Sequence, residues 1–325
     1  MRKAGVTALI VLVALAGSPA SSQTRTPWGD PDLQGTWDFT TITALQRPPE
    51  LAGKEFLTER EAAALEREIN QRRFDTEADS PGSLGGTPRP ATDPGIYNLG
   101  WWWEPNGRKL VGTRRTSLVI DPPDGRLPAL TPLAQKTQRA REQARERAAG
   151  PADLPLAERC VMGFNSGPPM VPGPYNNLVQ LFQSPGYVVI VNEMVHDARI
   201  VPLGKSAHVG DGIRLWMGDS RGRWEGNTLI VETRNFTHHG TGTFGPPGLV
   251  DRNLHLVERF TRLDDRRLLY QFTIDDPTVW TRPWTAEVPM TRVDGFVMEY
   301  GCHEGNYGLA NILSGARADE RVESR

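Results

Sequence analysis

Histidines close to carboxylates are the residues of this sequence with the most direct chemical meaning. Glu193 and His196 follow one apolar segment, and His255 opens another. An imidazole beside a carboxylate can take up and return a proton near neutral pH without a cofactor. We therefore expect acid–base chemistry of the kind used by lyases, isomerases or hydrolases. The candidate catalytic residues are His196, His255, Glu193 and Tyr270. The alternative is that these residues have structural roles only.

Two further pairs of charged residues lie near the ends of expected strands. They are Asp219 with Arg221, and Glu258 with Arg259. Both pairs fit either acid–base chemistry or ordinary salt bridges at the rim of a sheet. Adjacent residues of a strand point to opposite faces, so Glu258 and Arg259 cannot act together on one substrate.

Three of the nine tryptophans form a dense run at 101–103, and four more are distributed over the second half of the chain. In one interpretation they cover the ends and the core of a β-structure. In the other they line a pocket for an aromatic, steroid-like or sugar ligand. The residues expected to bind such a ligand are Arg259, Trp216, Trp224 and Trp284.

Two glycine-rich stretches match known motifs in spacing alone. Residues 240–245 have the spacing of a dinucleotide fingerprint, but two prolines follow where the phosphate-binding helix must begin. Residues 218–222 have the spacing of a nucleophile elbow, but they lead into another strand, so we expect a hairpin turn there. The six histidines show no zinc-binding spacing. We therefore expect neither a metal nor a cofactor.

The overall composition excludes some classes of partner. The chain has 325 residues and a formal net charge of −2, which gives no general attraction to nucleic acid. The basic stretch at 138–147 is interpreted as the solvated face of a helix. With 33 glycines and 27 prolines the sequence favours a turn-rich fold. The expected partner is a small-molecule ligand or substrate, and the oligomeric state stays open.

The N-terminus has the pattern of a cleaved secretory signal. Two basic residues at 2–3 precede an apolar run at 6–16, and small residues follow at 18–20. The apolar run is too short to span a bilayer. We expect residues 1–22 to be removed and the protein to be periplasmic or secreted, without stable membrane insertion.

Cys160 and Cys302 are the two cysteines of the sequence. In an oxidising compartment, two thiols of one exported chain are expected to form a disulfide. Two free thiols or a catalytic nucleophile are the alternatives, and neither has a local sequence signature.

Residues 23–177 are expected to form an irregular and helical region that packs on a core made by residues 178–325. A helix is predicted at 58–74, where Thr58 and Glu61 form a capping box. A second helix is predicted at 133–149 and ends before a Gly-Pro pair.

Residues 178–325 contain short runs rich in valine, isoleucine, threonine and aromatic residues, which are typical of strands. These runs are 178–182, 187–194, 199–203, 213–217, 228–236, 254–262, 267–274, 285–291 and 296–300. Hairpin-like breaks separate them, and no helix-length segment intervenes. The fold class is therefore mainly β, with sequential strands paired in an antiparallel up-and-down, calycin-like barrel. A sandwich is the alternative.

One hairpin predicts which side chains share a face. A four-residue loop at 263–266 places Arg259 opposite Tyr270, and His255 opposite Ile274. His255, Arg259 and Tyr270 would then point into an apolar interior. A slip of one residue would reverse this assignment for one of the strands.

Three blocks of the sequence resemble a known family. They are Pro-Trp-Gly-Asp-Pro-Asp-Leu-Gln-Gly at 27–35, Gly-Asp-Ser-Arg-Gly-Arg-Trp-Glu-Gly-Asn-Thr-Leu at 218–229, and Cys-His-Glu-Gly-Asn-Tyr at 302–307. They look like signature blocks of a family of exported, largely uncharacterised bacterial proteins. The resemblance implies export and a bacterial envelope setting, but it carries over no activity and no catalytic residue.

The sequence thus predicts an exported barrel that encloses a small organic molecule and acts on it by acid–base chemistry. A non-catalytic binding protein of the same shape is one alternative. A structural envelope protein with a filled barrel is the other. An enclosed cavity would favour binding or catalysis, whereas a packed interior would favour the structural protein.

Overall fold

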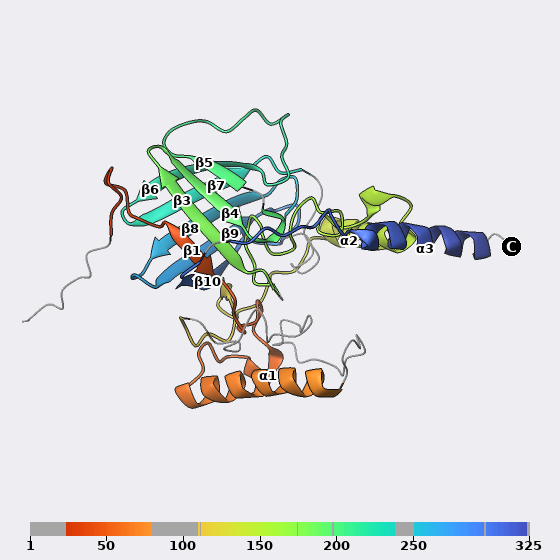
Figure 1. Cartoon of the computed structure of the whole chain (residues 1–325), viewed down its shortest axis with the longest axis horizontal. Helices are drawn as coiled ribbons and strands as arrows, with labels where there is room; N and C mark the ends of the chain where they lie inside the picture. The colour runs from red at the N-terminus through yellow and green to blue at the C-terminus, as the bar shows by residue number, and fades with distance from the viewer. Residues whose placement is uncertain are drawn as a thin grey trace, which may run out of the picture.

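A computed structural model of the chain describes residues 24–79, 110, 112–173, 175–196, 198–237, 250–295 and 297–323, without the side chains of 72–79 and 196. The expected signal peptide and the glycine-rich stretch at 240–245 lie outside these residues. The described part centres on one strongly curved antiparallel sheet, with helices outside it (Figure 1).

The sheet has ten strands in the order β5-β4-β3-β1-β10-β9-β8-β7-β6, with β2 beside β10. Their bounds are β1 (Gly35–Asp38), β2 (Val119–Asp121), β3 (Leu178–Ser184), β4 (Tyr187–Asn192), β5 (Ala198–Pro202), β6 (Asp219–Glu225), β7 (Thr228–Arg234), β8 (His255–Arg262), β9 (Arg267–Asp275) and β10 (Trp284–Val293). Every paired neighbour is antiparallel, which confirms the mainly β, antiparallel prediction.

The predicted strand list needs three corrections. Residues 218–222, expected to form a hairpin turn, lie mostly within β6 instead. Residues 213–217 and the described part of 296–300 form no strand. Sequential pairing also breaks between β5 and β6, which form no ladder, and β1 from the N-terminal region joins the sheet between β3 and β10.

The two edge strands, β5 and β6, approach each other without forming a ladder. A single parallel bridge joins Leu203 and Gly222, where the Gly204 N–H donates to the Gly222 carbonyl at 2.9 Å. A Cβ at Gly222 would lie 2.6 Å from a Leu203 methyl carbon and 3.0 Å from one of Val201. Glycine at this position therefore permits the close approach of the two edges.

The interior of the sheet is filled with side chains. The inward-facing residues with at most 1% of their surface exposed include Leu181, Ile190, Val201, Leu229, Val231, Leu256, Glu258, Phe260, Leu268, Tyr270, Phe272, Ile274, Trp284, Ala286, Val288 and Met290. Met170, from the segment before β3, is equally buried, and its N–H donates to the Tyr270 hydroxyl at 3.1 Å. Since neighbouring atoms cover all of these residues, the interior around them leaves no space for a ligand.

The register of β8 against β9 corrects the predicted face. Phe260 pairs with Tyr270, and Arg259 pairs with Gln271. The last pair of the ladder is Arg262 with Leu268, so five residues separate the paired positions, one more than expected, and within this turn the Asp264 side chain accepts from the Arg266 N–H at 2.9 Å. His255 and Arg259 therefore point outward, on the face opposite to Tyr270. The prediction that these three residues share a face was wrong.

Trp37 lies in β1, between β3 and β10, and is fully buried. Its Nε1 donates to the Leu33 carbonyl at 3.0 Å, and its side chain has no exposed surface. The guanidinium carbons of Arg262 and Arg292 each lie 6.0 Å from the centre of a Trp37 ring. This cation–π packing ties β1 to strands β8 and β10.

Three α-helices lie outside the sheet: α1 (Glu59–Asp79), α2 (Pro132–Arg147) and α3 (Tyr307–Glu323). Short 3₁₀ segments are η1 (Pro49–Leu51), η2 (Pro151–Asp153) and η3 (Met194–His196). The capping box of α1 is confirmed, because the Thr58 N–H donates to Glu61 at 2.9 Å and the Glu61 N–H donates to Thr58 Oγ1 at 3.3 Å. The second predicted helix corresponds to α2, whereas α3 was not predicted.

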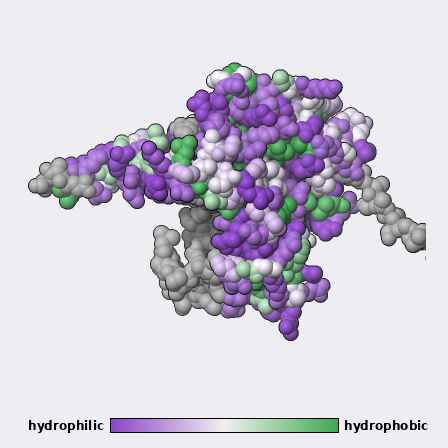
Figure 2. Space-filling model, turned by 180° about the vertical axis from the view of Figure 1, so that it is seen from behind, coloured by the Kyte–Doolittle hydropathy of each residue, from purple (hydrophilic) through white to green (hydrophobic). Residues whose placement is uncertain are grey.

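Helices α2 and α3 form an arm that extends away from the sheet, while α1 lies on another side (Figure 1). A disulfide between Cys160 and Cys302, with Cα atoms 5.7 Å apart, confirms the predicted pairing and holds the segment before α3 to the body. Seen from behind, the surface is mainly hydrophilic, with hydrophobic residues in small separate groups (Figure 2). Within the described residues, no helix is both long and apolar enough to cross a membrane.

Candidate functional site

The candidate catalytic residues Tyr270 and His255 lie on opposite faces of the sheet. Tyr270 lies in the interior, where its hydroxyl donates to Glu258 Oε1 at 2.8 Å. Burial, together with the charge of Glu258, raises the pKa of the Tyr270 phenol well above its usual value. Tyr270 therefore stays protonated and has no access to an external substrate.

Glu193 follows β4 and lies between the sheet and the segment that precedes β3. Its carboxylate accepts from the Leu178 N–H at 3.4 Å. Burial raises the pKa of Glu193, and hydrogen bonds from Asn176 and Leu178 oppose that rise. His196 belongs to η3, but its side chain lies outside the described atoms, so the predicted pairing with Glu193 stays a prediction.

The residues nominated for ligand binding are also dispersed. Trp284 is fully buried, and its ring packs edge-on against Phe272 with centroids 5.6 Å apart. Trp224 is half-buried and packs against the core. Trp216 is 37% exposed, with Arg159 over its ring. Arg259 points outward and pairs with Glu225 at 3.1 Å, so these four residues line no common pocket.

A different group of residues comes together on the outer face, at the end of strands β6 to β8. Asp219 begins β6, and the loop at 207–210 passes over it. The Nδ2 amide of Asn235, which follows β7, donates to the carbonyls of Val209 at 3.0 Å and Gly210 at 3.2 Å. Asn235 has a positive φ of 59°, a conformation that asparagine tolerates better than most residues. This anchor fixes the loop that carries His208.

His208 and Asp219 form a hydrogen-bonded pair. His208 Nδ1 lies 2.9 Å from Asp219 Oδ2, which also accepts from the Val209 N–H at 3.0 Å. Arg221 donates to the other oxygen, Oδ1, at 2.6 Å, so the expected contact of Asp219 with Arg221 is present. Three donors around one carboxylate hold it in place. Because a carboxylate only accepts, Nδ1 of His208 carries a proton, and in the neutral imidazole Nε2 is the nitrogen with the free lone pair.

Nε2 of His208 makes no hydrogen bond within the described part of the chain, and 23% of the His208 side chain is exposed. A histidine that is oriented through Nδ1 by a nearly buried carboxylate, with its other nitrogen open, is arranged as a general base. The exposed fraction of the Asp219 side chain is only 9%, so its bond to His208 is shielded from water.

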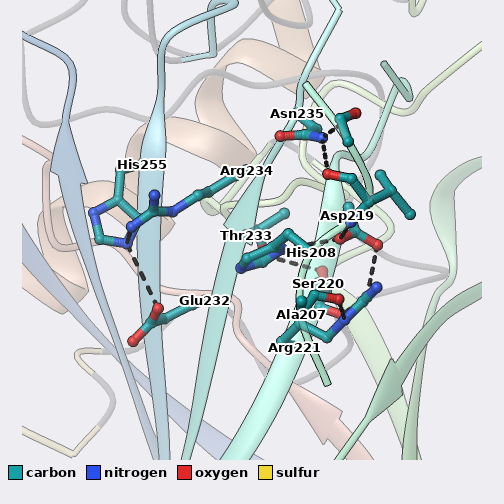
Figure 3. A network of polar contacts seen from close by, with 12 residues as sticks. Ala207, His208, Asp219, Ser220, Arg221, Glu232, Thr233, Arg234, Asn235 and His255 are labelled. Atoms are coloured by element: carbon teal, nitrogen blue, oxygen red, sulfur yellow. Dashed lines mark hydrogen bonds and ion pairs between the residues drawn. The ribbon is translucent and has the colours of Figure 1, made fainter. Parts of the chain in front are cut away.

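Arg234 and His255 border the same area. Asp219 pairs with Arg234 in the sheet register, and His255 occupies the next strand, with its Nε2 3.4 Å from Arg234 Nη2. In Figure 3 the His208 imidazole lies between Asp219 on one side and the Arg234–His255 pair on the other. Glu232 lies 3.9 Å from His255 Nε2.

The pKa of His255 is lowered, first by burial and then by the positive charge of Arg234. A protonated His208 would lower the pKa of His255 further, because the two histidines lie within electrostatic range. His255 is therefore a neutral imidazole near pH 7. Among the candidate catalytic residues whose side chains the structure describes, His255 is the one that lies beside the His208–Asp219 pair.

Sequence reasoning identified Asp219 but not His208, because the two are separated by a loop without regular spacing. One usable signal was the position of His208, which precedes a glycine-containing turn and the strand that begins with Asp219. Among the described residues, no group of three or more histidine, cysteine, aspartate or glutamate side chains could hold a metal ion.

Comparisons with protein-family models and with curated protein sequences both found no match. The functional assignment of the His208–Asp219 pair therefore depends on its geometry alone.

Proposed function

We propose that this chain is an exported protein whose sheet closes into a barrel and whose outer face performs proton transfer on a small organic molecule. The Leu203–Gly222 bridge between the edge strands supports closure. The Cys160–Cys302 disulfide is of a kind that forms and persists in oxidising compartments, which supports export. The packed interior moves the expected site from the inside of the barrel to its surface.

The observation that carries this proposal is the bond between His208 Nδ1 and Asp219, with Nε2 left open. His208 takes a proton onto Nε2 from a C–H or O–H group of the substrate or, in a hydrolysis, from the water molecule that attacks it. Asp219 stabilises the resulting imidazolium through its 2.9 Å hydrogen bond. His208 then returns the proton to another substrate atom or to the leaving group. This cycle needs no net oxidant or reductant and fits a lyase, an isomerase or a hydrolase.

The test begins with a thermal-shift screen of the purified protein against esters, amides, carboxylic acids and enolisable ketones. A compound that binds the native state raises the melting temperature. Compounds that do so are then incubated with the protein, and their conversion is followed by NMR.

We expect His208→Gln to lower turnover of such a compound by at least about 100-fold, as is usual for loss of a general base. Asp219→Asn should lower it as well, because the amide can leave the imidazole in the wrong tautomer. His303→Gln is the matched control, since His303 is exposed in the segment before α3. Equal turnover in wild type and His208→Gln would exclude this mechanism.

A second candidate function is a structural envelope protein with a filled barrel, and the packed interior favours it. Leu256, Phe272 and Trp284 expose none of their surface. In that case no compound of the screen raises the melting temperature of the wild type. A compound that does so equally in wild type and in every variant of the His208 site would favour a non-catalytic binding protein instead.

A further inference from the structure

Within the described residues, Arg234 beside the proposed base forms no ion pair with a carboxylate, although it lies within electrostatic range of Glu232. The neighbour of Arg234 in the β6 register, Asp219, already accepts from His208, Val209 and Arg221. Within the described residues the contact that Arg234 makes is the 3.4 Å approach to His255 Nε2. The residue is exposed, so its guanidinium is open to solvent.

Other arginines on this face of the sheet are paired. Arg223 of β6 contacts Glu232 at 2.6 Å and Glu225 at 2.9 Å, and Arg259 of β8 contacts Glu225 at 3.1 Å. Arg234 and Glu232 are two residues apart on β7, so their side chains lie on the same face of the sheet. Glu232 nevertheless pairs with Arg223 and not with Arg234. An arginine whose donors are left for an external group is suited to bind a planar carboxylate in a bidentate manner.

We propose that Arg234 binds the carboxylate of a small organic acid and thereby presents that molecule to His208. The inference rests on the proposed function, because His208 is taken there as the base. A carboxylate seated on Arg234 lies between the two histidines, since His255 contacts Arg234 and His208 covers Asp219 beside it (Figure 3).

The probe is sodium benzoate, and benzamide is its neutral counterpart of nearly the same shape. Binding is followed by NMR shifts of the histidine ring protons at constant ionic strength. We expect saturable shifts of His208 and His255 with benzoate and none with benzamide. Arg234→Gln, which keeps much of the length but removes the charge, should weaken benzoate binding by at least about tenfold.

Arg223→Gln is the matched control on the same face, and we expect it to change benzoate affinity by less than about twofold. His208→Gln should keep benzoate binding, observed at His255, because the base is not the anchor of the carboxylate. This result would support the anion site even if no turnover is found.

Three outcomes would overturn the inference. These are no saturable benzoate shift in the wild type, equal binding of benzamide, or equal losses in Arg234→Gln and Arg223→Gln. None of them bears on whether His208 acts as a base, which the turnover of neutral compounds tests separately.

Discussion

Arg199 of β5 and Glu258 of β8 form a buried ion pair across the interior of the sheet. Arg199 Nη2 donates to Glu258 Oε1 at 2.9 Å, and Nη1 contacts the other carboxylate oxygen. Glu258 has no exposed surface, and Arg199 has 6%. Tyr270 donates to the same carboxylate, so the charge of Glu258 is compensated on both sides. The edge strands β5 and β6 form no ladder with each other. The ion pair therefore links β5 to β8 across the interior of the sheet without a backbone ladder between the two edges.

We predict that Glu258→Gln destabilises the fold by about 3–5 kcal/mol, because it leaves Arg199 charged and buried without a partner. Replacing both residues, as in Arg199→Met with Glu258→Leu, should recover much of that loss. Urea denaturation of each variant measures the free energy of unfolding. Glu225→Gln is the control for an exposed ion pair and should leave the midpoint nearly unchanged. A double variant no more stable than Glu258→Gln would contradict this account.

The fold class could be predicted from the sequence, whereas the register could not. Strands β7, β9 and β10 have enough apolar and β-branched residues to identify them directly. β6 does not, because its inward positions include Ser220 and Gly222, and a larger residue at 222 would collide with Leu203. The β8–β9 register depended on a turn closed by the side chain of Asp264, which loop length alone does not predict.

We predict that removing the disulfide lowers stability and releases the segment before α3. Cys160 and Cys302 are separated by 142 positions, and a cross-link that closes so long a loop typically contributes about 2–4 kcal/mol. The Cys160→Ser, Cys302→Ser double variant should unfold at lower urea and be cleaved by trypsin at Arg317 faster than the wild type. Adding a reductant should bring the wild type to the same midpoint. Identical midpoints for reduced and oxidised protein would contradict the prediction.

The candidate site could be predicted only in part. Asp219, Arg221 and His255 carry recognisable acid–base chemistry and lie at strand ends, so sequence reasoning identified them. His208 comes from a loop whose position depends on Asn235, and nothing in its spacing connects the two. Tyr270 points into the packed interior because burial and register depend on long-range packing, and the pairing of Glu193 with His196 stays a prediction.

His255 should titrate below its ordinary pKa of 6.5, because burial and Arg234 both disfavour the imidazolium. The unfolded chain then binds more protons than the folded one as the pH falls below 6.5, so this group destabilises the fold progressively toward acid. NMR titration of the ring protons measures the pKa. Arg234→Gln should move it upward, whereas Arg223→Gln should not. If the pKa of His255 were the same in Arg234→Gln as in the wild type, the charge of Arg234 would not contribute to the lowered pKa, and burial would remain as its cause.

Glu193→Gln should stabilise the protein at neutral pH. Burial raises the pKa of Glu193 above 4.5, so the folded state favours the protonated carboxyl more than the unfolded state does. The protonated Glu193 side chain therefore stabilises the wild type below pH 4.5. This stabilisation is lost as the pH rises through the pKa that Glu193 has in the folded state. A glutamine keeps an oxygen for the Leu178 N–H and carries no charge to bury.

The comparison is between the urea midpoints of wild type and Glu193→Gln at pH 4 and pH 7. We expect the variant to have the higher midpoint at pH 7 and a smaller advantage at pH 4. Glu304→Gln, at an exposed position, is the control and should show no such difference. A variant that is less stable than the wild type at pH 7 would show that the ionised carboxylate is needed by Asn176 and Leu178, whose hydrogen bonds would then outweigh the cost of burial.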